Sequence, residues 1–255
     1  MFPGLSVTVH VPFARCRPAR HDGSMLVLGH RGASAAAPEN TVAAFRLADA
    51  MGADGVELDV RRVSDGRLLV AHDALPADLA EVDRMGLATL DEALDACGDR
   101  MLVNVEIKNW PADADFDPTM QIVAPVIESL RRRGTMHRWL ISSFSWETIE
   151  ACRAAAPEIA TAWLVSIVSP DRLATIAASG HAAVHPWEPN VTAEFVERCH
   201  SAGLAVNTWT CNDPERLEEL ADLGVDGVCT DVPDVALAAL GRDAAALSPV
   251  SYTNL

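Results

Sequence analysis

The sequence has no long apolar run. No stretch of its 255 residues approaches the roughly 18 consecutive apolar residues that a membrane-spanning helix needs. The apolar patch at residues 5–13 is followed by arginines and not by a small-residue cleavage site, so it lacks the pattern of a secretory signal. We expect residues 1–24 to form a poorly ordered leader or an edge strand, and we expect the protein to be cytoplasmic.

Positive charge is also scarce. The chain has 20 Lys and Arg residues against 36 Asp and Glu residues, a formal net charge of −16. A negative field of this size argues against nucleic acid and against an anionic membrane surface as partners. No basic amphipathic helix suggests stable membrane association either. We therefore expect a small soluble substrate, bound where local cations offset the field, and the oligomeric state stays open.

Paired cysteines are absent as well. The six cysteines, at positions 16, 97, 152, 199, 211 and 229, form no CxxC pair and show no zinc-like spacing. Most of them lie in apolar or helical contexts. We expect reduced, buried thiols that behave as small apolar side chains.

The sequence does contain a repeated unit: a short β-rich run, a polar cap, a helix and a glycine. The run at 205–210, for example, leads to Asp213-Pro214, a typical helix start, and the helix that follows ends at Gly224. Such alternation predicts parallel strands covered by helices. We expect strands at residues 25–30, 54–60, 101–107, 139–144, 159–165, 182–186, 205–210 and 226–230.

Eight such units in one chain are typical of a closed barrel and not of an open doubly wound sheet. The predicted fold class is therefore α/β, a single (β/α)8 TIM barrel over residues 25–243. Residues 244–255 are expected to form a C-terminal tail.

A hairpin is expected just after the second strand. The runs 56–63 and 67–72 flank Ser64-Asp65-Gly66, which reads as a tight turn. A parallel arrangement of the two runs would need a much longer connection. We expect His72 to lie on this antiparallel excursion, opposite Asp59.

Four short strings at the ends of apolar runs carry the chemistry: His30-Arg31-Gly32, Glu57-x-Asp59, His72-Asp73 and Glu106-x-Lys108. In a barrel of this kind, such strand ends meet on one rim. Carboxylates hold a hard cation, the cation with Arg and Lys neutralises phosphate charge, and histidines transfer protons. The strings together predict metal-assisted cleavage of a phosphodiester.

Over residues 25–240 the chain resembles the glycerophosphodiester phosphodiesterase family. The resemblance implies a barrel of the phosphatidylinositol-phospholipase-C type, a divalent metal ion, and hydrolysis of glycerophosphodiesters to glycerol 3-phosphate and an alcohol. The strings that carry it are, in chain order, Gly29-His30-Arg31-Gly32-Ala33, Pro38-Glu39-Asn40-Thr41, Gly52-Ala53-Asp54, Glu57-x-Asp59, Asp65-Gly66, His72-Asp73, Glu106-x-Lys108, Ser142-Ser143-Phe144, Trp209-Thr210, Gly224-Val225-Asp226-Gly227 and Thr230-Asp231-x-Pro233.

The resemblance also implies a role for each predicted site residue. The metal ligands would be Glu57, Asp59 and Glu106, the acid/base pair His30 and His72, and the phosphate-binding residues Arg31 and Lys108. An all-oxygen ligand set favours Mg²⁺ or Ca²⁺ over Zn²⁺ as the one divalent cation.

The chain departs from the family after His72-Asp73, where only Ala74–Ala88 precedes the helix predicted at Thr89–Cys97. Family members usually have a longer stretch there. We expect a mouth that is open on this side and that accepts several head groups. Trp209 is expected to bind the substrate, with an apolar face and one N–H donor.

Two questions of mechanism and function stay open at this point. The nucleophile is either water or a neighbouring hydroxyl of the substrate, the latter acting through a cyclic phosphate. The alternatives to the main function are a phospholipase-D-like phosphodiesterase acting on lysophospholipids and a non-catalytic barrel that binds phosphodiesters.

Overall fold

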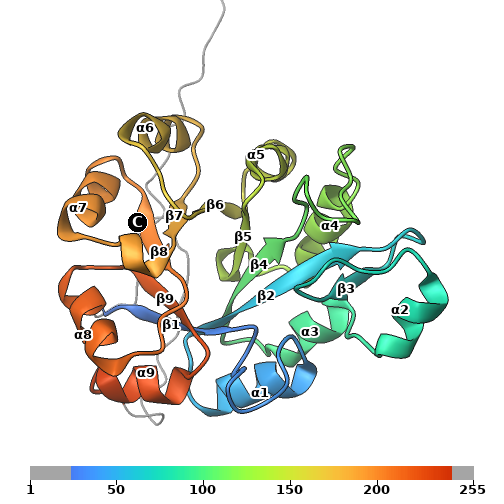
Figure 1. The fold of residues 1–255 in the computed structure, drawn as a ribbon, viewed down its shortest axis with the longest axis horizontal. Coiled ribbons are helices and arrows are strands. Elements are labelled where there is room, and N and C mark those ends of the chain that lie inside the picture. Colours follow the sequence, from blue (N-terminus) through green and yellow to red (C-terminus); the bar gives the residue numbers. More distant parts are fainter. Residues whose placement is uncertain (1–23, 243–255) are drawn as a thin grey trace, which may run out of the picture.

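Eight parallel strands close into a barrel in the computed structural model, which describes residues 24–242 (Figure 1). Their order is β1-β9-β8-β7-β6-β5-β4-β2, and a further pairing of β1 with β2 closes the ring. The barrel strands are β1 (Leu26–His30), β2 (Gly55–Arg62), β4 (Leu102–Ile107), β5 (Trp139–Ser143), β6 (Ala160–Val165), β7 (Ala183–Pro186), β8 (Ala205–Thr208) and β9 (Gly227–Thr230).

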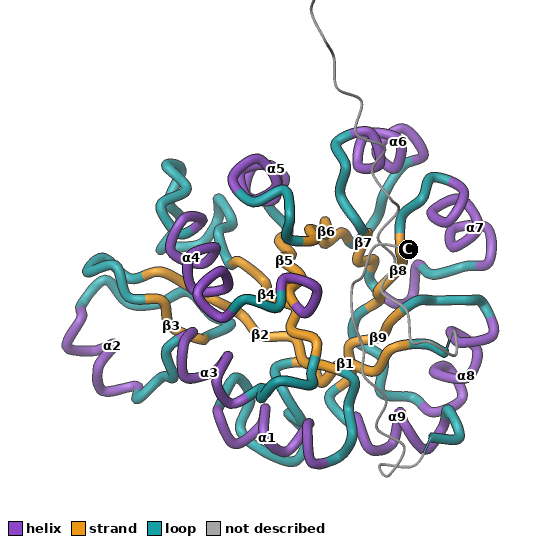
Figure 2. The backbone as a smooth tube through the Cα atoms, turned by 180° about the vertical axis from the view of Figure 1, so that it is seen from behind, coloured by secondary structure: helices purple, strands orange, loops and turns teal. Residues whose placement is uncertain are grey.

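Helices surround the ring of strands, as Figure 2 shows from behind. Most begin at a residue whose side chain accepts a backbone N–H, and Thr89 with Glu92 forms a complete capping box. The helices are α1 (Val42–Ala50), α2 (Leu79–Met85), α3 (Leu90–Ala96), α4 (Val123–Arg133), α5 (Trp146–Ala155), α6 (Pro170–Ala178), α7 (Ala193–Ser201), α8 (Pro214–Asp222) and α9 (Pro233–Ala239). The predicted (β/α)8 TIM barrel is thus confirmed. The predicted leader falls almost wholly outside the described residues, and the predicted tail lies entirely outside them.

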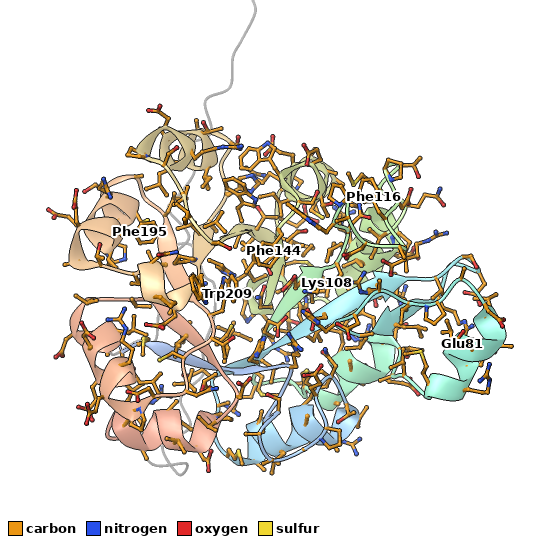
Figure 3. All side chains as sticks on the ribbon, in the orientation of Figure 1. Glu81, Lys108, Phe116, Phe144, Phe195 and Trp209 are labelled. Carbon is orange, nitrogen blue, oxygen red and sulfur yellow. The ribbon has the colours of Figure 1, made fainter. Side chains whose placement is uncertain are left out.

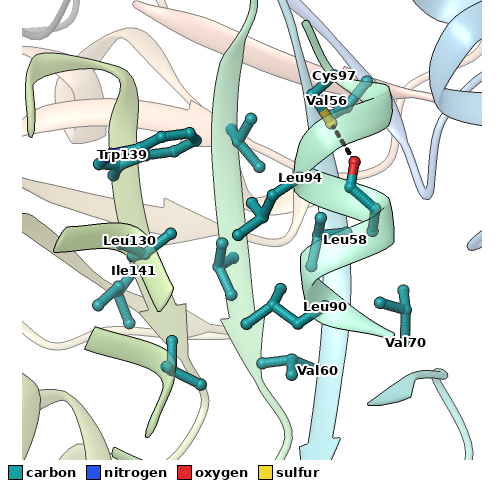
Figure 4. Packing of buried hydrophobic residues seen from close by; sticks show 14 of the residues in the cluster. Val56, Leu58, Val60, Val70, Leu90, Leu94, Cys97, Leu130, Trp139 and Ile141 are labelled. Carbon is teal, nitrogen blue, oxygen red and sulfur yellow. Dashed lines mark hydrogen bonds between the residues drawn. The ribbon is translucent and has the colours of Figure 1, made fainter. Parts of the chain in front are cut away.

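Side chains alternate between the two faces of each barrel strand. Val56, Leu58 and Val60 of β2 point outward and pack against Leu90 and Leu94 of α3 (Figure 4). The residues between them, Glu57 and Asp59, therefore point into the barrel. The alternation along β2 thus places the carboxylates inside the barrel and the apolar side chains in the core between strands and helices.

The barrel interior changes character along its axis. Its N-terminal end is filled by small and aliphatic side chains, among them Leu26, Leu102 and Leu140. The inward positions nearer the C-terminal ends are polar, as at Asn104, Ser142 and Asn207, and all three are buried. Apolar side chains therefore fill the barrel at the N-terminal ends of its strands, and the polar groups lie at the C-terminal ends.

The expected hairpin is present, but its register differs from the prediction by one residue. Strand β3 (Leu68–Val70) pairs antiparallel with β2, and the Ala71 N–H donates to the Asp59 carbonyl at 3.1 Å. Ala71, and not His72, therefore lies opposite Asp59. The turn itself is the predicted one: Gly66 has a φ of 95°, and the Val63 N–H donates to the Arg67 carbonyl at 3.0 Å. Counting along the strands from this pair places Ala71 opposite Asp59.

The short stretch after His72 contains helix α2, which the sequence analysis did not predict. A separate apolar cluster that includes Leu69, Leu75 and Val82 ties this helix to the hairpin. Figure 1 shows α2 and β3 beside the barrel, away from its centre. Within residues 24–242, no helix is long and apolar enough to cross a membrane.

Candidate active site

Three carboxylates meet at the C-terminal end of the barrel. Asp59 on β2 pairs in register with Glu106 on β4, and Glu57 lies two residues before Asp59 on the same face. One oxygen from each of the three side chains lies within 4.8 Å of the others. All three residues are less than 10 % exposed. Such close, buried like charges are costly unless a cation joins them.

The pKa shifts within this cluster reflect that cost. Burial, together with the charges of Asp59 and Glu106, raises the pKa of Glu57 well above its ordinary value. Burial and the charge of Asp59 also raise the pKa of Glu106. Burial alone would raise the pKa of Asp59, but Lys108, Asn40 and Arg31 together hold it below its usual value.

Two basic side chains border the carboxylates. The Lys108 Nζ lies 2.7 Å from Glu106 Oε1 and 3.2 Å from Asp59 Oδ1. The Arg31 Nε lies 3.3 Å from Asp59 Oδ2, and the Arg31 backbone N–H donates to Glu57 Oε2 at 3.0 Å. These are local cations of the kind that an anionic substrate would need in a protein of charge −16.

His30 ends β1 and is held by a carboxylate from the neighbouring strand end. Its Nδ1 lies 2.7 Å from Asp231 Oδ1, just after β9. Asp231 also accepts hydrogen bonds from Ser34 Oγ at 2.9 Å and from Asn212 Nδ2 at 2.6 Å. The hydrogen bond with His30 contributes most to lowering the pKa of Asp231 to about 2. An ionised Asp231 thus fixes the ring and leaves Nε2 as its free nitrogen.

His72 lies across the site, just beyond the hairpin. Its Nδ1 lies 2.8 Å from Asp73 Oδ1, and its side chain is 38 % exposed. The hydrogen bond with His72 is also the main cause that lowers the pKa of Asp73. Both histidines therefore share one arrangement, in which a carboxylate binds Nδ1.

Two further residues support the cluster from the loop before α1. Asn40 donates from Nδ2 to Asp59 Oδ2 at 2.8 Å and accepts the Asp59 N–H at 3.3 Å. Glu39 accepts two hydrogen bonds of 2.9 Å from Arg31 Nη1. Asn40 and Arg31 both have positive φ, so the loop backbone is shaped to make these contacts.

Three residues of the site were not predicted from the sequence: Asp231, Asn40 and Glu39. Each belongs to a string that carries the family resemblance, and that was the only available signal. Their roles depend on contacts between distant segments, since Asp231 lies 201 positions from His30.

All eight predicted site residues gather at this end of the barrel. A cleft of about 60 Å³ is lined by seven of them, and Asp59 lies beneath it in contact with Lys108. Figure 3 shows Lys108, Phe144 and Trp209 close to the barrel axis. The seven lining residues are His30, Arg31, Glu57, His72, Glu106, Lys108 and Trp209.

Trp209 differs from the prediction in one respect. Its indole N–H donates to the His185 carbonyl at 2.9 Å, so this donor is already used within the protein. The ring packs edge-on against Phe144, with centroids 5.4 Å apart. Trp209 therefore offers the cleft an apolar face without the N–H that the sequence analysis assigned to it.

The carboxylate cluster fits a divalent cation. Among the described residues, the buried Glu57 Oε1 has no hydrogen-bond partner, so one ligand atom is free. Three converging carboxylates from two adjacent strands are the donors that hard cations prefer. The geometry does not distinguish one hard cation from another.

Comparisons with known proteins find relatives over most of the chain. The model of the glycerophosphoryl diester phosphodiesterase family matches residues 30–86 and 75–235. A glycerophosphodiester phosphodiesterase of Caldanaerobacter subterraneus is 30 % identical over 83 % of this chain and 96 % of its own length. The uncharacterized protein YqiK of Bacillus subtilis is 32 % identical over 85 % of this chain and 99 % of its own length.

Solved structures are similar throughout the barrel. An Oleispira antarctica phosphodiesterase in complex with its product sn-glycerol-3-phosphate matches with a TM-score of 0.77 and 25 % identity, covering 87 % of this chain and 98 % of that one. A Silicibacter pomeroyi protein assigned as a glycerophosphoryl diester phosphodiesterase matches with a TM-score of 0.75 and 27 % identity. The match covers 89 % of this chain and 97 % of that one. This chain belongs to the glycerophosphoryl diester phosphodiesterase family.

Proposed function

We propose that this protein hydrolyses glycerophosphodiesters to glycerol 3-phosphate and an alcohol, with one Mg²⁺ or Ca²⁺ ion held by Glu57, Asp59 and Glu106. The observation that carries the proposal is the buried carboxylate cluster, with His30 and His72 lining the cleft above it. The product complex of the Oleispira antarctica relative supports the substrate class. The bound cation would supply Lewis-acid stabilisation of charge on the phosphate.

The two histidines are proposed to move the protons. Because Asp231 and Asp73 bind the Nδ1 atoms, each neutral ring presents an unprotonated Nε2, and each protonated ring presents an Nε2–H. One ring can thus accept a proton from the nucleophile while the other donates one to the leaving alkoxide. Arg31 and Lys108 would hold the phosphate between the rings.

Removal of the metal and of the histidines tests the proposal. Chelation with EDTA should abolish turnover of glycerophosphocholine, and Mg²⁺ or Ca²⁺ should restore it. His30→Ala and His72→Ala should each lower the rate by roughly 10²–10⁴-fold, the range for general acid–base catalysis. His137→Ala is the matched control, since His137 is exposed and precedes β5 at the opposite end of the barrel. Full activity after exhaustive chelation would refute the role of the metal.

The nucleophile can be identified with an altered substrate. A diester whose glycerol half lacks the hydroxyl next to the phosphate cannot form a cyclic phosphate. Turnover of this diester at an undiminished rate would establish direct attack by water. Loss of turnover, with binding retained, would establish the cyclic route.

One observation favours a second candidate function, a phospholipase-D-like activity on lysophospholipids. Large apolar side chains are exposed on loops that follow the barrel strands: Trp110 at 48 %, Ile167 at 83 % and Trp187 at 46 %. Such a rim suits contact with an acyl chain or a micelle. Release of choline from micellar lysophosphatidylcholine faster than from glycerophosphocholine would favour this function. Binding of both compounds without turnover would instead indicate a non-catalytic barrel.

A further inference from the structure

A second cavity adjoins the cleft over the carboxylates. It encloses about 320 Å³ and shares His72, Glu106, Lys108 and Phe144 with that cleft. A diester whose phosphate lies against Lys108 would therefore extend one of its two ester groups into this cavity, on the side of His72. We call it the head-group cavity.

Acidic side chains determine the charge of this cavity. Asp73 and Asp113 both line it, and the Asp73 side chain is 96 % exposed. Arg61 also lines the cavity; it is 3 % exposed and contacts Asp113 at 2.9 Å, Asp115 at 2.6 Å and the His72 carbonyl at 2.7 Å. Two carboxylates thus exceed one guanidinium by one negative charge, and Asp73 adds another. Lys108, the other cation that lines the cavity, is already paired with Glu106 and Asp59.

Aromatic rings form the other walls. Trp110 lies on the segment that joins β4 to α4, lines the cavity and is 48 % exposed. Phe144 lies at the end of β5, toward the barrel axis (Figure 3). Aromatic faces attract organic cations, and they do so more strongly when carboxylates lie nearby and water is partly excluded. Carboxylates together with aromatic walls suit an ammonium group better than a polyol.

We propose that the head-group cavity binds a cationic alcohol, of the quaternary or primary ammonium class, and makes the enzyme selective for zwitterionic diesters. This inference rests on the proposed phosphodiesterase function. The net charge of −16 also favours a zwitterionic diester, because such a diester is neutral overall and is not repelled. It differs from the broad tolerance expected from the short Ala74–Ala88 stretch, because the segment after β4 supplies a wall that the sequence analysis did not anticipate.

The test compares kcat/KM for glycerophosphocholine and for the polyol diester glycerophosphoglycerol. We expect the native enzyme to prefer glycerophosphocholine by about 10-fold or more, since one cation–π contact with a partly desolvated group supplies that much. Trp110→Ala should remove most of this preference by lowering kcat/KM for glycerophosphocholine. The same variant should lower kcat/KM for glycerophosphoglycerol less, so that the ratio of the two values falls toward one.

Asp113→Asn and Asp115→Asn form a matched pair for the carboxylate. Both residues bind Arg61, but only Asp113 lines the cavity. Asp113→Asn should reduce the preference for the cationic diester, whereas Asp115→Asn should keep the native ratio of the two kcat/KM values. Equal changes of this ratio in both variants would show an effect transmitted through Arg61 and would overturn the role of Asp113.

The outcomes separate this inference from the function on which it rests. Hydrolysis of both diesters with equal efficiency by the native enzyme would overturn the head-group cavity and leave the phosphodiesterase function intact. Absence of turnover of both diesters in the presence of Mg²⁺ or Ca²⁺ would overturn the proposed function and the inference with it. A preference that persists in Trp110→Ala would also contradict the proposal.

Discussion

At the scale of single residues, Asp231 shows how a side chain far away in the sequence orients the His30 ring from the neighbouring strand end. Because it binds His30 Nδ1 at 2.7 Å, Asp231→Asn should leave the ring less well oriented and able to adopt the other tautomer. We expect kcat to fall by roughly 10–100-fold, the usual cost of losing a partner that orients a site histidine. Asn212→Ala is a milder control, since it removes a bond to Asp231 but not the bond to His30. A kcat within twofold of the native value in Asp231→Asn would contradict the positioning role.

The same residue predicts a pH dependence of stability. The folded pKa of Asp231 is about 2, below its ordinary value of 3.8. A lowered pKa stabilises the folded state fully above pH 3.8 and progressively less as the pH falls toward 2. Because Asp231 is only half-buried, solvent screening reduces this contribution to about 1 kcal/mol.

Urea unfolding of the native protein and of Asp231→Asn measures this contribution. The difference in unfolding free energy between the two proteins should be larger at pH 6 than at pH 3. A difference that does not change between these two pH values would show that the His30–Asp231 hydrogen bond does not lower the pKa in solution.

The sequence predicted individual site residues better than it predicted their contacts. All eight residues predicted from the strings do lie at the C-terminal end of the barrel, because the ends of its parallel strands meet there. The N–H of Trp209 was misjudged, since the carbonyl of His185 that uses it belongs to a neighbouring strand. Contacts between strands are decided by register, which a single sequence does not specify well.

At the scale of elements, strand β2 carries two carboxylates of the site on its inner face and apolar core residues on its outer face. Gly55 begins this strand, and a Cβ added there would lie 2.4 Å from the Leu102 carbonyl oxygen of β4. Gly55→Ala should therefore push β2 away from β4 and destabilise the protein by about 1–3 kcal/mol, the usual cost of overpacking. Chemical unfolding measures the loss.

A second measurement links this strand to the site. Asp59 and Glu106 pair in register across β2 and β4, so a displacement of β2 should also weaken metal binding in Gly55→Ala. Unfolding and metal affinity that both match the native protein would show that the two strands accommodate the methyl group.

The elements themselves were largely predictable. All eight barrel strands lie where their apolar runs predicted, because caps, glycines and periodicity agreed along the chain. The hairpin and its turn were predicted, but Asp59 was paired with His72, one residue beyond its actual partner Ala71. Helix α2 and the wall formed by Trp110 were missed, because both lie in polar segments without a regular period.

At the scale of the whole molecule, the net negative charge would repel an anionic substrate, whereas the fold places two cations where such a substrate would bind. The chain carries −16 overall, yet Arg31 and Lys108 lie at the cleft beside the carboxylates. The barrel concentrates these two cations at one end of its axis and keeps the other end apolar. A strongly acidic protein can thus bind an anion at a single point on its surface.

The proposed metal site predicts that the stability of the whole barrel depends on a bound cation. Glu57, Asp59 and Glu106 come from two neighbouring strands and repel one another when all are ionised. In the proposed site an ion would bind this arrangement only in the folded state, so its binding free energy would add to the unfolding free energy. At a metal concentration of about 100 times Kd the gain is about 2.7 kcal/mol. For a domain of this size that gain corresponds to a rise in Tm of about 5–10 °C.

Thermal unfolding with EDTA and with rising Mg²⁺ or Ca²⁺ tests this dependence, with Glu106→Gln as the comparison. The variant keeps the size of the side chain but removes one charge, so it should be less repelled without metal and gain less with it. We therefore expect its Tm in EDTA to equal or exceed that of the native protein, and its rise with metal to be clearly smaller. Equal metal-dependent rises in the two proteins would place the stabilising ion elsewhere, because an ion bound by these carboxylates cannot be indifferent to the loss of one of them.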